Sequence, residues 1–321
     1  MTEDWLTDGD PFADPAAAER ERRRLERQGR RRPPEGGRKN GRRALVALAL
    51  AAVALAVVGV GLALYRHFHR SAAPAPVALK TVTVTIPEGY SRAQAASLAK
   101  EDGLRGGYEA ASVRSKYLDP ARYGGKGAKN LEGFLFPDTF ELRRHTPVTD
   151  LVQLQLQDFK RRLEGVDMGY ARSKNLTTYD VVTIASMIER EAQVASERKL
   201  VAAVIYNRLH DGMPLGIDAT IRFATGNYTR PLTESQLATS SPYNTRTSQG
   251  LPPGPIDSPG LASLEAAAHP AKVDYLFYVV KPGACGRLAF SSTEAQFQRD
   301  VELYDSARAA AGGNSPTTCG E

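Results

Sequence analysis

The feature that most restricts how this chain can fold is an apolar segment from Ala44 to Tyr65, which has no charged residue in 22 positions. As a helix, at about 1.5 Å per residue, it is longer than the ~30 Å hydrocarbon layer of a bilayer. The apolar core of a cleaved signal peptide is shorter, about 7–15 residues, and lies nearer the N-terminus. We therefore expect a membrane-spanning helix at residues 44–65.

Basic residues are concentrated immediately before this segment. Residues 1–43 contain twelve Arg or Lys against nine Asp or Glu, and residues 71–321 contain 28 against 27. The positive-inside rule then places the N-terminus in the cytoplasm and residues 71–321 outside, in a single-pass protein of the cell membrane. A nucleic-acid-binding protein needs its basic excess on the folded domain, so we expect no nucleic-acid partner.

Residues 1–43 are rich in Pro, Gly and Arg and are predicted to be disordered. Such a segment either attracts anionic lipid or a cytoplasmic partner, or only solubilises the chain and sets its topology. Residues 66–80 are predicted to be a linker.

The remaining composition argues against metal or cofactor chemistry. The five histidines are scattered without metal-ligand spacing, and no Gly-rich phosphate loop is present, so we predict no metal and no cofactor. Cys285 and Cys319 are the only cysteines, and both lie on the predicted exported side. An oxidising compartment permits a disulfide between them, but the sequence leaves that pairing open.

The exported part shows signals for both strands and helices, so the predicted fold class is α+β. Several helix starts carry capping boxes, which pair a Ser or Thr with an acidic or amide residue three positions later. The expected strands are 81–86, part of 131–142, 275–280 and 288–291, and the expected helices are 91–100 (cap Ser91, Gln94), 151–163, 177–192 (cap Thr177, Asp180), 197–210, 259–268 and one capped by Thr293 and Gln296.

Glu191 is the strongest candidate for chemistry. Residues three, four and seven positions before it are Ile188, Met187 and Ile184, so its carboxylate shares a helix face with apolar neighbours. Loss of hydration there favours the protonated form and suits a general acid near neutral pH. The same pattern also fits a glutamate at the flank of this face that forms a salt bridge. Glu189 points elsewhere on the helix and is the weaker candidate.

Ordered motifs on both sides of Glu191 strengthen this interpretation. They are Leu-Glu-Gly-Phe-Leu-Phe-Pro-Asp-Thr-Phe (131–140), Ala-Ser-Met-Ile-Glu-Arg-Glu-Ala (185–192), Val-Ile-Tyr-Asn-Arg-Leu (204–209), Ser-Pro-Tyr-Asn-Thr (241–245), Gly-Leu-Pro-Pro-Gly-Pro-Ile (250–256) and Asp-Tyr-Leu-Phe-Tyr-Val (274–279). Together they resemble the YceG-like endolytic murein transglycosylases, across roughly residues 80–305. In that family the second glutamate of the Glu-x-Glu pair is catalytic, and it corresponds to Glu191 here.

The resemblance implies a membrane-anchored lytic transglycosylase that cuts nascent glycan strands of peptidoglycan. Glu191 would protonate the bond between N-acetylmuramic acid (MurNAc) and N-acetylglucosamine (GlcNAc) and then act as base, leaving 1,6-anhydroMurNAc ends. It also implies a small LysM-like subdomain at 81–130, which either holds glycan or is only structural, a catalytic domain at 131–310 and a flexible tail at 311–321. Peptidoglycan synthases (penicillin-binding proteins) are the implied protein partners.

Two alternatives to this function remain open from the sequence. One is a hydrolytic muramidase in which Glu132, Asp218 or Glu189 supplies a second carboxylate. The other is a non-catalytic wall-binding scaffold that positions synthases, which the intact Glu-x-Glu block disfavours.

Six side chains are candidates for substrate contacts: Glu132, Asn207, Asp218, Thr220, Tyr243 and Asn244. Of these, Tyr243 and Asn244 best suit sugar, through ring stacking and amide hydrogen bonds, unless they only form a turn after Pro242. Asp218 and Thr220 precede a strand-like run and either line the cleft or, for Asp218, form an Asx-type turn. Glu132 equally fits an ion pair, and Asn207 a helix cap or a core hydrogen bond.

Overall fold

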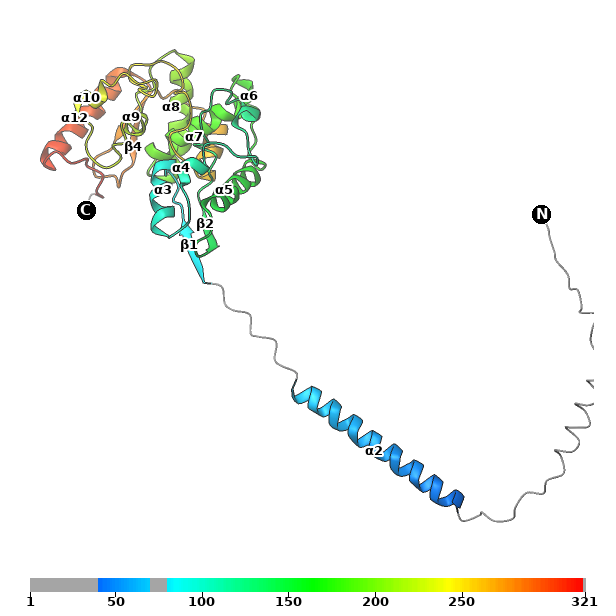
Figure 1. Ribbon diagram of the computed structural model, residues 1–321. Coiled ribbons are helices and arrows are strands. Elements are labelled where there is room, and N and C mark those ends of the chain that lie inside the picture. The colour runs from blue at the N-terminus through cyan, green and yellow to red at the C-terminus, as the bar shows by residue number, and fades with distance from the viewer. Residues whose placement is uncertain (1–39, 70–79, 320–321) are drawn as a thin grey trace, which may run out of the picture. The chain divides into compact units, whose positions relative to one another are not determined.

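The computed structural model describes residues 40–69 and 80–319, which belong to two separate units (Figure 1). The predicted disorder of residues 1–43 falls almost wholly outside these ranges, as does most of the predicted linker 66–80. Each unit is described by itself.

The first unit contains the helix α2 (Asn40–Phe68). Its side chains from Arg42 to Phe68 are exposed, and the helix is long and apolar enough to cross a membrane. A helix that is apolar on all sides needs apolar surroundings, such as the interior of a membrane. The expected apolar helix at 44–65 is therefore confirmed, and its composition is compatible with a membrane anchor.

The second unit mixes helices with short strands, which confirms the α+β class. Its elements in chain order are β1 (Thr81–Thr85), α3 (Arg92–Glu101), α4 (Tyr108–Ala111), η1 (Pro120–Tyr123), β2 (Thr139–Arg143), α5 (Val148–Leu163), α6 (Gly169–Ser173), α7 (Thr178–Glu191), η2 (Ala195–Glu197), α8 (Arg198–His210), α9 (Asp218–Thr225), α10 (Glu234–Leu237), α11 (Leu261–Ala268), β3 (Phe277–Val280), β4 (Leu288–Ser291) and α12 (Glu294–Ala310).

A two-stranded antiparallel sheet joins β1 to β2, in a register that pairs Val82 with Leu142 and Val84 with Phe140. Val84, Phe140 and Leu142 are buried, because alternate residues of each strand face the core. The pairing connects residues on both sides of the predicted boundary at 130/131. The LysM-like subdomain therefore stays a prediction, and β1 and β2 belong to one compact unit.

Helix α7 runs through the core of the second unit and packs against α8 and α11 (Figure 1). Its N-terminus has the predicted capping box, in which Thr177 accepts a hydrogen bond from the backbone N–H of Asp180 and Asp180 accepts one from Thr177 N. Every side chain from Val181 to Ile188 is buried. The catalytic candidate at the end of α7 thus stands on a helix fixed along two turns.

The β3–β4 hairpin forms the other two-stranded sheet, with Phe277 opposite Ser291 and Val280 opposite Leu288. Helix α12 packs on the hairpin, and the rings of Phe277 and Phe297 stack with centroids 4.9 Å apart. A disulfide between Cys285 and Cys319 connects the hairpin turn to the chain after α12.

One expected element is wrong. Asp218 and Thr220 do not precede a strand, because Asp218–Thr225 forms the helix α9. The β-branched residues in this segment favour a strand, but Ile221 is fully buried and Gly226 ends the helix with a φ of +67°. Tertiary packing therefore overrides the local preference.

Candidate active site

Glu191 is the last residue of α7, where the helix leaves the core. Its side chain is partly buried, and the Tyr278 hydroxyl donates a hydrogen bond to Oε2 at 3.1 Å. Burial raises the pKa of the Glu191 carboxyl; the Tyr278 hydrogen bond opposes this, and the Asp218 charge adds to it. A carboxyl group in this setting keeps its proton at a higher pH than a solvated one, as a general acid requires.

A cleft of about 570 Å³ opens beside Glu191. Its walls come from α7, α9, α12 and the β3–β4 hairpin, and they include Asp218, Arg246 and Tyr278. Asp218 Oδ1 accepts hydrogen bonds from Arg246 Nε at 2.8 Å and Nη2 at 2.7 Å. Of the predicted substrate contacts, Asp218 is the one that shares this cleft with Glu191.

Glu189 occupies a different environment from Glu191, although the two are separated by one residue. Its side chain is 7% exposed, accepts a hydrogen bond from Gly260 N at 2.9 Å and lies 3.5 Å from Arg198. These contacts hold the start of α11 against α7. Of the two glutamates, Glu191 is the one that lines the cleft.

Glu132 is buried and is not among the residues that line this cleft. Its carboxylate accepts from the first backbone N–H of α3, at Arg92, with N–O distances of 3.0 and 3.2 Å. Burial raises its pKa to about 7, despite the opposing effect of that hydrogen bond. The structure therefore places Glu132 at the N-terminus of α3, where it fixes the helix, rather than beside Glu191.

Asn207 and Thr220 also have structural partners. Asn207 Nδ2 donates to the carbonyl oxygens of Val273 and Tyr275, both at 2.9 Å, and so holds the segment that leads into β3. Thr220 is fully buried, and its hydroxyl donates to Ile217 O at 2.7 Å within the first turn of α9. Neither residue lines the cleft.

Tyr243 and Asn244, the preferred sugar contacts from the sequence, organise the loop between α10 and α11. Asn244 is 0% exposed; its Nδ2 donates to Leu237 O and Thr239 O, and its Oδ1 accepts from Arg246 N. The Tyr243 ring packs 5.0 Å from Phe223, and burial raises the pKa of its hydroxyl to about 12. The Asn244 amide thus makes three hydrogen bonds within this loop, and its contact with sugar stays a prediction.

Two residues of the cleft, Tyr278 and Arg246, were not predicted from the sequence. Tyr278 lies in the 274–279 motif, and the alternation of a strand puts it on the face opposite Phe277. Tyr278 lines the cleft, where its hydroxyl reaches Glu191. The contact between Tyr278 and Glu191 joins residues 87 positions apart in the sequence, so the motif alone could not show it.

Within residues 40–69 and 80–319 no group of three or more His, Cys, Asp or Glu side chains lies close enough to hold a metal ion. The cleft beside Glu191 contains its carboxyl group, the Tyr278 hydroxyl and the Asp218–Arg246 pair.

The fold and the cleft together define a class of protein. It is an α+β protein with a partly buried glutamate in an open cleft. The same chain contains an apolar helix long enough to span a membrane. The chain belongs to the YceG-like family, whose model matches residues 64–303.

Curated relatives support this assignment. The endolytic murein transglycosylase of Bacillus subtilis is 35% identical over 179 residues, which cover 56% of this chain and 49% of that protein. The protein of the same name from Streptococcus pneumoniae strain R6 is 33% identical over 176 residues, 53% of this chain and 32% of that protein. The matched region thus spans half or less of the curated relatives' length.

A solved structure shows the same fold. The crystal structure of a YceG-like protein from Listeria monocytogenes aligns with a TM-score of 0.61 and 27% identity. The alignment covers 68% of this chain and 75% of that one.

Proposed function

We propose that this chain is a membrane-anchored endolytic lytic transglycosylase of peptidoglycan, with Glu191 as its general acid and base. The observation that carries the proposal is the position of Glu191, in an open cleft, with a raised pKa and one hydrogen bond from Tyr278. The names of the relatives supply the reaction class. The bond cleaved is the β-1,4 linkage between MurNAc and GlcNAc.

The reaction needs only one titrating side chain. Protonated Glu191 gives its proton to the glycosidic oxygen, and the C1–O bond breaks with its electron pair going to that oxygen. The resulting carboxylate then takes the proton of the MurNAc C6 hydroxyl, whose oxygen bonds to C1. The product is a 1,6-anhydroMurNAc end, and Glu191 is protonated again for the next cycle.

Burial and the hydrogen bond from Tyr278 shift the pKa of Glu191 in opposite directions. Burial favours the protonated acid, and the hydrogen bond from Tyr278 favours the carboxylate that must act as base. A group that serves first as acid and then as base works best with a pKa near the ambient pH. This arrangement suits a single-carboxylate mechanism.

A hydrolytic muramidase is the second candidate, because Asp218 shares the cleft and its charge acts on Glu191. Such an enzyme uses its second carboxylate to activate water or to attack the sugar. Asp218 Oδ1 already accepts two hydrogen bonds from Arg246, so part of this carboxylate is occupied. Glu132 and Glu189, the other candidates for this role, are held at helix N-termini.

The two candidates are distinguished by the ends of the product strands. Digestion of purified glycan by the full chain in detergent should give anhydro ends, which are lighter by one water than the reducing ends from hydrolysis. Reducing ends as the main product would contradict the transglycosylase.

Glu191→Gln should abolish cleavage, because the amide cannot donate the proton, while the melting temperature stays close to that of the unmodified protein. Glu265→Gln is the matched control, since Glu265 is an exposed glutamate on α11 outside the cleft. Equal turnover by the Glu191→Gln variant and the unmodified protein would remove Glu191 from the mechanism.

The remaining parts of the proposal concern the location of this activity. Helix α2 anchors the chain, with the Arg-rich N-terminus cytoplasmic and the second unit exported, because the basic residues lie on the N-terminal side of the helix. Residues 81–130 act as a LysM-like lobe, and peptidoglycan synthases are the protein partners. Both follow from the family resemblance.

A further inference from the structure

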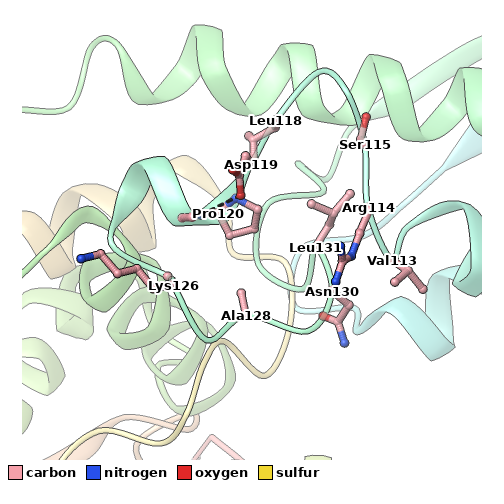
Figure 2. A pocket seen from close by; sticks show the side chains of 12 residues that line it. Val113, Arg114, Ser115, Leu118, Asp119, Pro120, Lys126, Ala128, Asn130 and Leu131 are labelled. Carbon is pink, nitrogen blue, oxygen red and sulfur yellow. Dashed lines mark hydrogen bonds between the residues drawn. The ribbon is translucent and has the colours of Figure 1, made fainter.

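The second unit contains another pocket, which shares no lining residue with the cleft of Glu191. Residues 113–131, which include η1, enclose about 350 Å³. Figure 2 shows the side chains of Arg114 and Asn130 close to each other on one side of this pocket, and Lys126 on the other side with its amino group directed away from both.

Positive charge is concentrated in the segment that forms the pocket. It contains Arg114, Lys116, Arg122, Lys126 and Lys129 and only one acidic residue between positions 114 and 129, whereas residues 71–321 as a whole are almost neutral. None of the five forms a salt bridge with a residue that the structure describes. This uncompensated charge attracts an anion.

The pocket also offers hydrogen-bond donors of the right kind. The side chains of Arg114 and Lys126 line it, and neither has a hydrogen-bond partner in the described ranges. Asn130 uses its Oδ1 to accept from Glu132 N at 2.9 Å, which leaves Nδ2 able to donate. The one carboxylate in the lining, Asp119, accepts from Ala121 N at 3.0 Å. The charged side chains of the lining are Arg114, Lys126 and Asp119, so its net charge is +1, which suits a single carboxylate.

Apart from Ser115, the rest of the lining is apolar, with Val113, Leu118, Pro120 and Leu131 among its residues. A volume of this size lies at the small end of ligand pockets, about 300–1,000 Å³. A concave, partly apolar pocket favours an anion with a small apolar body. It disfavours a membrane surface, which needs basic residues on a flat or convex face.

Helix α7, which carries Glu191, supports the shape of this pocket. The loop that follows η1 packs on the N-terminus of α7, where a Cβ on Gly124 would overlap Thr177 and one on Gly125 would overlap the Tyr179 ring. Glycine at both positions permits this close approach. A loop fixed before binding loses less conformational entropy when a ligand enters.

We propose that this pocket binds the free carboxylate of a short peptide with small side chains, through Arg114 and Asn130. Arg114 can form two parallel hydrogen bonds to the carboxylate, and the apolar wall contacts a methyl side chain. If the proposed function holds, the peptide is the stem peptide carried by the glycan strand. That identification rests on the proposed function, whereas the peptide pocket does not.

Calorimetric titration of the full chain in detergent with acetyl-D-alanyl-D-alanine tests the pocket directly. The C-terminal amide of the same dipeptide, which lacks the charge, should bind at least about tenfold more weakly. Arg114→Gln should weaken binding of the acid by about tenfold, the loss of one charge-assisted pair. Lys100→Gln, an exposed lysine on α3 outside the pocket, should bind as the unmodified protein does.

Three results would overturn the proposal. They are equal affinity for the acid and the amide, unchanged affinity in the Arg114→Gln variant, and displacement of the dipeptide by inorganic phosphate at a similar or lower concentration. The last would indicate a general anion site. Circular dichroism of each variant checks that the fold is intact.

Turnover separates this proposal from the proposed function. With peptide-bearing glycan as substrate, Arg114→Gln should raise KM severalfold without a matching fall in kcat. If the unmodified protein cleaves no glycan but binds the dipeptide acid, the proposed function is wrong and the peptide pocket stands.

Discussion

The hydrogen bond from Tyr278 to Glu191 joins a strand residue to the end of a helix 87 positions away in sequence. It lowers the pKa of Glu191, which burial raises. In Tyr278→Phe the pKa should therefore rise further, and the carboxyl group stays protonated to a higher pH.

The expected result for Tyr278→Phe is a lower kcat, because Glu191 is less well oriented and is a poorer base in the second step. The high-pH limb of the rate profile, where the acid is lost, should move to higher pH. Glycan cleavage measured from about pH 4 to about pH 9 checks this, a range that spans the ordinary and the raised pKa of a carboxyl group. A limb that moves to lower pH, or does not move, would show that Tyr278 does not control the ionisation of Glu191.

The raised pKa of Glu132 leads to a prediction about how the stability of the fold depends on pH. Its pKa in the folded protein is raised from 4.5 to about 7, so the folded state holds a proton in a pH range where the unfolded state has lost it. The stabilisation is complete below about pH 4.5 and is lost as the pH rises through 7. The free energy of unfolding should fall by up to about 3 kcal/mol from this group.

Glu132→Gln should remove most of this pH dependence, since the amide oxygen can still accept from Arg92 N but carries no charge. Chemical denaturation at about pH 5 and about pH 8, on either side of the raised pKa, gives the comparison when followed by circular dichroism. An equal pH dependence in both proteins would mean that Glu132 ionises as a solvated carboxyl group does.

Among the elements, α7 depends on the capping box at Thr177. Thr177→Ala removes the side-chain acceptor for Asp180 N and should lower the free energy of unfolding by about 1 kcal/mol. Thr149→Ala, at an exposed position of α5, is a control that removes a threonine hydroxyl without removing a cap. Thermal denaturation measures both; a smaller loss for Thr177→Ala than for Thr149→Ala would contradict the role of the cap.

The helices and strands were largely predictable because their signals are local. The capping boxes at Ser91 and Thr177 and the alternation in 81–86 lie in a few consecutive residues, and the structure has all three. Asp218–Thr225 was predicted wrongly, because the helix there depends on the burial of Ile221, which only tertiary packing decides.

The site was less predictable than the fold. The position of Glu191 on an apolar helix face was readable from its own neighbours, and the raised pKa agrees with it. The partners of the other candidates were not readable, since Glu132 binds a backbone N–H 40 residues away and Asn207 binds carbonyl oxygens 66 and 68 residues away. Residue type showed that these side chains are polar but not what they contact.

For the whole molecule, the division into two units leads to a prediction about truncation. Residues 78–321 form a compact unit with its own core, so this segment produced alone should fold and melt at the same temperature as in the full chain. It should also fail to sediment with membranes, because α2 is removed. Sedimentation and calorimetry of both proteins test this; aggregation of the shorter chain would show that its core needs the residues before Ala78.

The bond between Cys285 and Cys319 affects how this protein has to be made. Cytosolic thiol systems keep cysteines reduced, so material purified from the cytosol of an expression host would carry two free thiols. The turn beside the strand that bears Tyr278 would then be attached to the chain end by weak contacts alone, such as that from Cys285 N to Thr318 O. Samples for kinetics should accordingly come from secreted or oxidatively refolded protein, with thiol content measured first.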